Sequence, residues 1–207
     1  MSVKKIFQSS GLEGHLKKII MRGLVVFALL CCPSVPAFGQ SAEQGNLGKV
    51  LVLYYSYSED ANTEKVAGII QGLTNAELVK VEPETPFPEM EYRRFTRWAK
   101  EQQQQGAYPP IRDLKVDMAA YDFIFVGTPV WWGLPSLPIT TLLRQTDFGG
   151  KPLAAFSTAK GGPGTAVSDI GKQAKNALVR SGANFNNVVS DRQISEKVGA
   201  WVKSLQR

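Results

Sequence analysis

The 207 residues of the chain suffice for one well-buried domain. Its 24 Lys and Arg residues against 18 Asp and Glu residues give a net charge of +6, but five of these cations and one of these acids lie in residues 1–39. The remainder has 19 cations, 17 acids and a net charge of +2, without the basic stripe typical of nucleic-acid-binding proteins, so no nucleic-acid partner is expected.

Residues 1–39 have the pattern of a secretory signal peptide. Met21-Arg-Gly is positively charged, Leu24–Cys32 is almost wholly apolar, and small residues precede a predicted cleavage site after Gly39. The apolar run is shorter than the roughly 20 residues that span a bilayer, so no stable membrane insertion is expected after signal removal. The prediction is a periplasmic or secreted protein. A translation start at Met21, a retained N-terminal anchor and a cytoplasmic protein with an unprocessed tail stay open as alternatives.

The only histidine and both cysteines of the chain precede this cleavage site. They are His15, Cys31 and Cys32. The mature protein is therefore expected to lack disulfides, thiol chemistry, most kinds of zinc site and imidazole catalysis. The sequence predicts no catalytic side chain and no metal site.

Downstream of a polar, flexible leader at residues 40–48, strand patterns alternate with helix patterns through residues 49–207. Strands are predicted at residues 50–55, 77–82, 121–127, 151–157 and 184–190. Helices are predicted at residues 62–73, 90–104, 137–145, 165–181, with Gly182 as a cap, and 193–205. This alternation indicates one α/β domain with a parallel sheet and helices on both faces, in which ligands bind at the carboxyl ends of the strands.

The helix predicted at residues 90–104 has an aromatic face. Tyr92, Phe95 and Trp98 follow one another at a spacing of three residues. Packing of this face on the sheet or on a neighbouring loop is the favoured interpretation, and ligand binding is the weaker alternative.

The first strand ends in a turn, residues 56–63, that is rich in hydroxyl and amide side chains. A helix is predicted to begin within this turn. The free N–H groups of a helix N-terminus and the helix dipole favour an anion, so the turn is interpreted as a phosphate site. A plain helix cap explains the turn by itself equally well.

Two further loops follow strands that are expected to be neighbours of the first. Trp131 and Trp132 stand just after a strand and between prolines, where they offer a flat apolar face to a planar heteroaromatic ligand. The loop at residues 161–164, Gly-Gly-Pro-Gly, lets the backbone approach a ligand closely. The alternatives are that a tryptophan packs on a helix and that the glycine loop is a flexible turn. A phosphate site beside a site for a flat heterocycle indicates flavin mononucleotide (FMN) as the ligand.

Three motifs in this order resemble the flavodoxin-like family, in its branch of small FMN-binding oxidoreductases. They are Val50–Ala67, Tyr121–Gly133 with the segment Gly-Thr-Pro-Val-Trp-Trp-Gly, and Phe148–Gly164. The resemblance extends from Lys49 to the C-terminus and implies a doubly wound, five-stranded parallel sheet of strand order 2-1-3-4-5.

The same resemblance assigns cofactor-binding roles to the residues of the three loops. The FMN phosphate is assigned to Ser56, Ser58, Asn62 and Thr63. The isoalloxazine ring is assigned to Pro129, Val130, Trp131, Trp132 and Gly133. The other edge of the ring and the ribityl chain are assigned to Thr158, Ala159, Lys160, Gly161, Gly162 and Gly164.

The first loop departs from the family at one place. The family has a single glycine where this chain has Glu59-Asp60-Ala61, which brings two carboxylates next to the expected phosphate. The expected function is transfer of electrons by bound FMN to a small acceptor such as a quinone. A flavodoxin-type carrier with a redox protein as its partner is one alternative, although carriers have a strongly acidic surface that this chain lacks. A binding protein that kept the fold and lost the cofactor is the other.

Overall fold

The computed structural model describes residues 47–57 and 59–207. The predicted signal peptide and most of the predicted leader lie outside these residues, as does Ser58. Within the described ranges, none of the helices is both long enough and apolar enough to cross a membrane.

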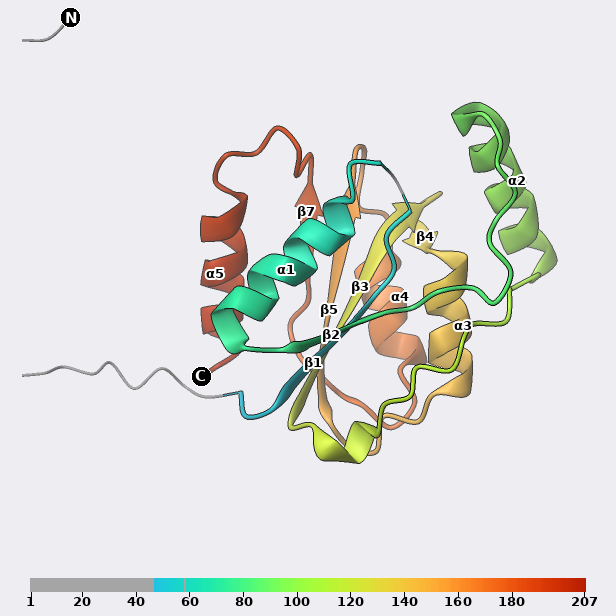
Figure 1. The fold of residues 1–207 in the computed structure, drawn as a ribbon. Coiled ribbons are helices and arrows are strands. Elements are labelled where there is room, and N and C mark those ends of the chain that lie inside the picture. Colours follow the sequence, from blue (N-terminus) through green and yellow to red (C-terminus); the bar gives the residue numbers. More distant parts are fainter. Residues whose placement is uncertain (1–46, 58) are drawn as a thin grey trace, which may run out of the picture. The chain divides into compact units, whose positions relative to one another are not determined.

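Strands and helices alternate along the domain, as Figure 1 shows. The strands are β1 (Val50–Tyr54), β2 (Glu77–Lys80), β3 (Phe123–Trp131), β4 (Leu134–Pro135), β5 (Pro152–Ala159), β6 (Leu178–Val179) and β7 (Ala183–Asn186). The helices are α1 (Asn62–Thr74), α2 (Tyr92–Gln105), the single 3₁₀ turn η1 (Met118–Ala120), α3 (Leu137–Gln145), α4 (Ala166–Gln173) and α5 (Ile194–Ser204).

The sheet has the order β2-β1-β3-β5-β6, and all of these neighbours are parallel. β7 also pairs with β5 in parallel, so β6 and β7 are two pieces of one edge strand. When β6 and β7 are counted as one strand, the predicted five-stranded order 2-1-3-4-5 is confirmed. The strand β2 forms the other edge of the sheet. The strands β1, β3 and β5 are adjacent, as expected, and the three loops that follow them leave the sheet at one end.

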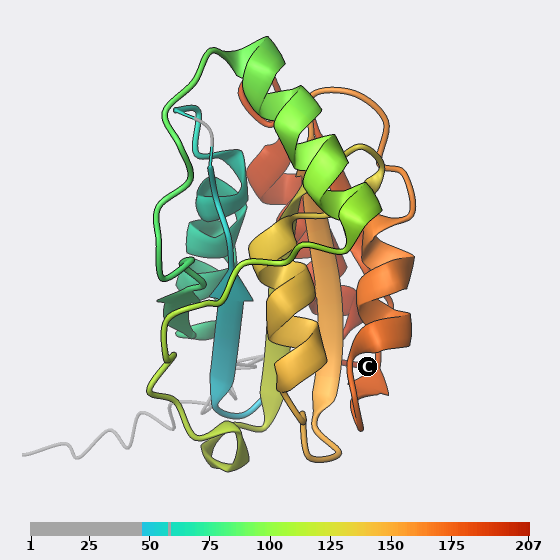
Figure 2. The same cartoon turned by 90° about the vertical axis from the view of Figure 1, so that its right-hand side faces the viewer.

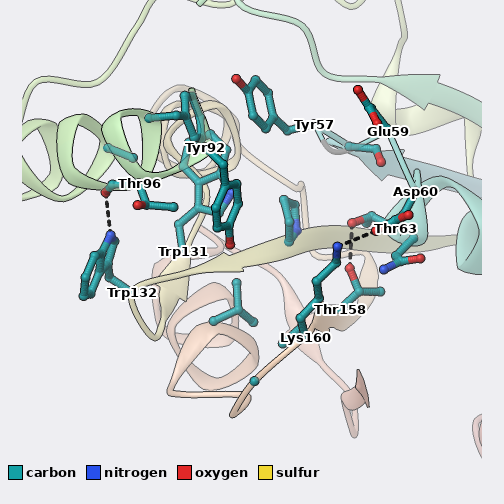
Figure 3. A pocket seen from close by; sticks show the side chains of 18 of the residues that line it. Tyr57, Glu59, Asp60, Thr63, Tyr92, Thr96, Trp131, Trp132, Thr158 and Lys160 are labelled. Atoms are coloured by element: carbon teal, nitrogen blue, oxygen red, sulfur yellow. Dashed lines mark hydrogen bonds and ion pairs between the residues drawn. The ribbon is translucent and has the colours of Figure 1, made fainter. Parts of the chain in front are cut away.

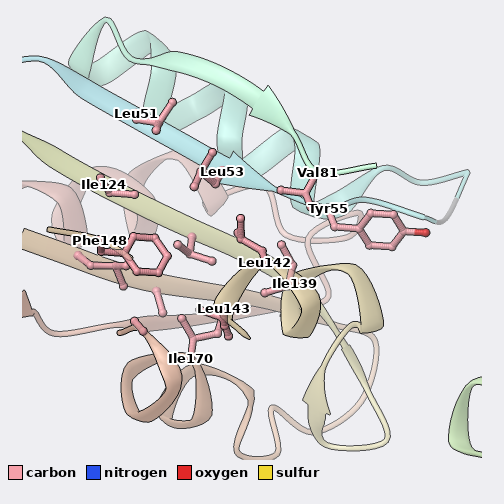
Figure 4. Close-up of a cluster of buried hydrophobic side chains, with 14 of the residues drawn as sticks. Leu51, Leu53, Tyr55, Val81, Ile124, Ile139, Leu142, Leu143, Phe148 and Ile170 are labelled. Atoms are coloured by element: carbon pink, nitrogen blue, oxygen red, sulfur yellow. The ribbon is translucent and has the colours of Figure 1, made fainter. Parts of the chain in front are cut away.

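The alternation of side chains along the buried strands divides the core between the two faces of the sheet. Leu51 and Leu53 of β1 point to the face covered by α3 and α4, where they meet residues such as Leu142 (Figure 4). Val50 and Val52 point to the face covered by α1 and α5. Because both faces are covered, β1 is apolar and buried along its whole length.

The helix α2 does not cover either face of the sheet. Figures 1 and 2 show it beyond the carboxyl ends of the strands, in the neighbourhood of β4. Of its residues only Phe95 and Ala99 are buried. The helix therefore stands at the edge of the sheet where the three loops emerge.

One predicted helix is shorter than expected. The helix predicted at residues 165–181 ends at Gln173, and Gly182 does not cap it. Asn176 has a left-handed backbone (φ 57°), which turns the chain back toward the sheet, and the following residues form β6. Gly182 instead separates β6 from β7, where a Cβ atom would lie 2.7 Å from the carbonyl oxygen of Ala155. The last strand is also shorter than the predicted residues 184–190, because β7 ends at Asn186.

Candidate functional site

A cavity of about 1140 Å³ opens at the carboxyl ends of β1, β3 and β5 (Figure 3). All three loops that the sequence singles out contribute to its lining, so they converge as predicted. The predicted site residues that line it are Ser56, Asn62, Thr63, Pro129, Val130, Trp131, Trp132, Gly133, Thr158, Ala159, Lys160, Gly161 and Gly162.

Two predicted site residues are not among the lining residues. Ser58 lies outside the described part of the chain. Gly164 lies against the second loop, because a Cβ atom at this position would fall 2.2 Å from the Cα atom and the carbonyl oxygen of Gly133. Glycine at this position allows the backbones of the second and third loops to approach closely. A contact between Gly164 and a cofactor stays a prediction.

The first loop presents an open helix N-terminus to the cavity. The N-cap of α1 is Ala61, and its methyl side chain cannot accept hydrogen bonds from the first N–H groups of the helix. Next to it Asn62 is only 7% exposed, and its Oδ1 atom has no hydrogen-bond partner among the described residues. Because buried polar atoms are normally paired and Oδ1 is an acceptor, this atom fits a ligand that offers a hydrogen-bond donor such as a hydroxyl group. Free N–H groups and the positive end of the helix dipole favour an anionic group in that ligand.

The first and third loops are joined at two points. The hydroxyl groups of Thr63 and Thr158 are 2.8 Å apart and buried. Toward the outside, the Lys160 ammonium lies 2.6 Å from the Asp60 carboxylate, as Figure 3 shows. The hydrogen bond from Lys160, together with its charge, lowers the pKa of Asp60 below the ordinary value, so Asp60 is ionised at neutral pH. The insertion of the first loop thus adds a carboxylate that already has a counterion, which offsets part of its repulsion toward an anion.

The second loop is a tight hairpin that the sequence analysis did not predict. β3 continues past the predicted end at Gly127 to Trp131, and β4 pairs with it antiparallel. The two residues between them, Trp132 and Gly133, both have positive φ, 54° and 83°. Two-residue hairpin loops commonly have this geometry, but tryptophan rarely adopts it.

Contacts with α2 hold Trp132 in this strained backbone conformation. Its indole N–H donates a hydrogen bond of 2.6 Å to the carbonyl of Thr96, and the Lys100 ammonium lies 4.5 Å from the centre of its ring. Gln103 adds a hydrogen bond of 3.1 Å to the carbonyl of Trp131. The second loop and α2 therefore form one connected unit at the mouth of the cavity.

Trp131 belongs to a group of six aromatic side chains that we call the aromatic cluster. Its members are Tyr55, Tyr57, Phe87, Phe95, Trp98 and Trp131. Phe95 and Trp98 pack here, which agrees with the favoured interpretation of the aromatic face on α2. Tyr92 does not pack in this way, because it is 72% exposed and lines the cavity.

The sequence analysis missed several lining residues, of which Tyr57 and six residues in or before α2 form the largest group. These six are Glu89, Met90, Tyr92, Phe95, Thr96 and Ala99. The aromatic spacing on α2 is a signal for Tyr92, but packing was the favoured interpretation of that spacing. Tyr57 stacks on Phe95, with ring centres 4.0 Å apart, and the residue as a whole is 39% exposed. Partial burial raises its pKa, so the hydroxyl is protonated at neutral pH and can donate a hydrogen bond.

Among residues 47–57 and 59–207, no three His, Cys, Asp or Glu side chains are grouped so that they could hold a metal ion. The chemistry available at the cavity is anion binding at α1, hydrogen bonding from hydroxyls and backbone groups, and aromatic stacking.

Replacing Ala61 with glycine is expected to raise the free energy of unfolding by about 0.5 to 1 kcal/mol. Ala61 has a left-handed backbone (φ 47°, ψ 37°), which is strained for alanine and unstrained for glycine. Urea unfolding measures the change. The same substitution at Ala200, an exposed position inside α5, is expected to lower the free energy by about 0.5 to 1 kcal/mol. A loss of stability in both variants would contradict the strained conformation of Ala61.

Comparisons with known proteins agree with this architecture. A crystal structure of a flavoprotein in complex with FMN from Lactobacillus acidophilus NCFM is 31% identical in sequence. The match has a TM-score of 0.59 and covers 66% of this chain and 93% of that one. A protein from Bacteroides eggerthii DSM 20697 shares the fold, with a TM-score of 0.64 at 21% identity over 77% of this chain and 99% of that one.

No curated protein matches the sequence. The family model described as flavodoxin matches residues 49–205, which is nearly the whole predicted domain and includes all three loops of the cavity. On this match and on the strand order of its sheet, the chain belongs to the flavodoxin family.

Proposed function

We propose that the protein binds FMN in this cavity and uses it as an oxidoreductase that passes electrons to a small acceptor such as a quinone. The open N-terminus of α1 is the observation that carries the proposal, and the buried, unpaired Oδ1 atom of Asn62 beside it fits a hydroxyl donor of the same ligand. The helix N-terminus supplies an anion site of the kind that suits a phosphate group. The FMN-bound flavoprotein that is 31% identical to this chain supports the choice of ligand.

Three parts of the cavity would hold three parts of FMN. Ser56, Asn62 and Thr63 would bind the phosphate together with the first N–H groups of α1. The third loop, from Thr158 to Gly162, would line the ribityl chain and one edge of the ring, and the second loop would line the isoalloxazine ring. When bound, FMN would supply the two-electron redox chemistry that reduces an acceptor such as a quinone to its hydroquinone.

An enzyme fits the charge of the chain better than an electron carrier. Carriers use a strongly acidic surface to steer toward partner proteins, and residues 40–207 have a net charge of +2. Anaerobic mixing of the FMN-loaded protein with NAD(P)H in a stopped-flow instrument separates the two functions. Reduction of the flavin supports an enzyme with a nicotinamide donor, and its absence favours a carrier or another donor.

Titration of the purified protein with FMN tests the cofactor itself. Quenching of flavin fluorescence at micromolar protein would support binding. No binding at these concentrations would favour the alternative, a binding protein that kept the fold without the cofactor. The specific observation behind that alternative is the pair of added carboxylates, Glu59 and Asp60, at the mouth of the cavity.

Replacement of Lys160 with methionine is expected to weaken FMN binding about five- to tenfold and to change riboflavin binding less than about threefold. The substitution removes the counterion of Asp60 and leaves that carboxylate facing the phosphate of FMN, which riboflavin lacks. Additional replacement of Asp60 with asparagine is expected to restore most of the affinity. Lys172→Met is the matched control, since this exposed lysine pairs with Asp169 on α4. An equal loss for FMN and riboflavin would contradict the electrostatic explanation.

We also propose that the protein works in the periplasm or outside the cell, on the basis of the signal pattern in residues 1–39. N-terminal sequencing of the protein isolated from its native host is expected to begin at Gln40. A sequence that begins at Met1 or Met21 would overturn this proposal.

A further inference from the structure

We propose that the outer side of α2 docks the protein on an anionic lipid surface, as a peripheral membrane protein. The observation that carries the inference is a group of three cations on one side of this helix. They are Arg93, Arg97 and Lys100, which we call the cationic face. The docking goes beyond the proposed function and does not depend on bound FMN.

Helical periodicity directs the cationic face away from the buried side of α2. Arg93, Arg97 and Lys100 follow one another at spacings of four and three residues, which places them on one side of a helix. All three are exposed, whereas the buried residues of the helix are Phe95 and Ala99. Both views of the ribbon show α2 at the periphery of the domain, beyond the sheet (Figures 1 and 2). The cationic face is therefore open to solvent.

Within the described part of the chain, no carboxylate neutralises the cationic face. The guanidinium groups of Arg93 and Arg97 take part in none of the ion pairs there. The Lys100 ammonium lies over an aromatic ring, a contact that leaves its charge in place. The carboxylates of the first loop, on Glu59 and Asp60, lie on the other side of the cavity from α2 (Figure 3). Unpaired cations on one side of a helix give that side a positive potential.

The positive charge of the domain is concentrated in this helix. With Arg94, α2 has four cations against one carboxylate, that of Glu101, and so a net charge of +3. Residues 40–207 together have a net charge of +2, so the rest of them is slightly negative. Two further carboxylates, Glu89 and Glu91, precede the helix, and that of Glu91 accepts a hydrogen bond from the Arg94 N–H at the helix start. An anionic surface is therefore attracted to α2 rather than to the domain as a whole.

An exposed aromatic side chain on the same helix favours a lipid surface over an acidic protein. Tyr92, the first residue of α2, is 72% exposed, more than any other large apolar side chain in the described residues. Tyrosine combines an apolar ring with a polar tip and is enriched at membrane–water interfaces. Arginine and lysine are attracted to anionic head groups at the same depth. The outer side of α2 thus offers both kinds of group that such an interface binds.

Docking through α2 would bring the mouth of the cavity next to the lipid. Tyr92 and Thr96 of this helix line the cavity, and Lys100 lies over Trp132 of the hairpin at the cavity mouth. An apolar electron acceptor dissolved in the membrane would then reach the cavity without crossing water. This consequence rests on the proposed function, whereas the docking itself does not.

Co-sedimentation with lipid vesicles tests the docking. The protein used is residues 40–207, because the apolar run at residues 24–32 would itself bind lipid. This piece retains every described strand and helix and both sides of the hydrophobic core, so it folds on its own. We expect binding to vesicles with about 30% phosphatidylglycerol and binding about tenfold or more weaker to pure phosphatidylcholine. Salt at about 0.5 M is expected to abolish the difference.

Arg97→Gln is expected to lower the partition coefficient for the anionic vesicles about fivefold, and Arg93→Gln with Arg97→Gln about 25-fold. FMN affinity is expected to change less than about twofold in both variants, because neither arginine lines the cavity. Arg180→Gln is the matched control, since it removes an exposed arginine that forms no ion pair among the described residues and follows β6 at the edge of the sheet. This control is expected to change vesicle binding less than about twofold.

Equal vesicle binding by the Arg97→Gln and Arg180→Gln variants, or equal binding of the wild type to the two kinds of vesicle at low salt, overturns the inference. A wild-type protein that binds polyglutamate and neither kind of vesicle also overturns it and favours an acidic protein as the partner. Vesicle binding is measured with and without FMN. A protein that binds vesicles but no FMN overturns the proposed function alone, whereas one that binds FMN but no vesicles overturns this inference alone.

Discussion

Replacement of Gly164 with alanine is expected to lower the free energy of unfolding by about 2 to 4 kcal/mol and to weaken FMN binding at least tenfold. Gly164 has a left-handed backbone (φ 54°), and an added Cβ atom would lie 2.2 Å from the Cα atom and the carbonyl oxygen of Gly133. These atoms belong to the backbone of the hairpin, so they cannot rotate away as a side chain can. The second and third loops must separate, and the hydrogen bond of 2.7 Å from the Thr165 N–H to the Gly133 carbonyl is lost.

Urea unfolding and FMN titration measure the two effects. Gly161→Ala and Gly162→Ala are controls from the same loop, because nothing lies within 4 Å of a Cβ atom at either position. Their free energies of unfolding are expected to stay within about 0.5 kcal/mol of the wild-type value. If Gly164→Ala behaves like these controls in both measurements, the close contact between the second and third loops does not exist in solution.

The fold could be predicted from the sequence because its signals are local. The apolar runs that became β1, β3 and β5 are short and buried on both faces, and each is followed by residues that favour a turn. Because these strands alternate with helices, the sheet is parallel, and the loops that follow β1, β3 and β5 all leave it at the same end. The convergence of Thr63, Trp131 and Thr158 on one cavity follows from this topology.

The parts that could not be predicted depend on contacts between residues far apart in the chain. The conformation of Trp132 is held by Thr96 and Lys100, which lie in a different helix. The pairing of Asp60 with Lys160 is likewise invisible in the sequence, where the insertion is seen only as two added carboxylates. The position of α2 beyond the sheet could not be predicted either, because an aromatic helix face predicts packing but does not identify the element it packs against.

Replacement of Asn62 with aspartate is expected to weaken FMN binding at least a hundredfold and to change riboflavin binding less than about threefold. Asn62 is the first residue of α1 and is 7% exposed, so the new carboxylate would be held where the phosphate is expected. Two unit charges of the same sign 4 Å apart repel by about 4 kcal/mol at an effective dielectric constant of 20. A phosphate has up to two negative charges, and a hundredfold loss of affinity corresponds to only about 2.7 kcal/mol.

Unfolding of the variant is not expected to cause the loss of FMN affinity, because a carboxylate at a helix N-terminus interacts favourably with the helix dipole. The free energy of unfolding of the FMN-free Asn62→Asp variant is therefore expected to equal or exceed that of the FMN-free wild type. Asn62→Ala removes the amide without adding charge and is expected to weaken FMN binding only about five- to tenfold. If Asn62→Asp binds FMN as tightly as Asn62→Ala does, the phosphate lies elsewhere.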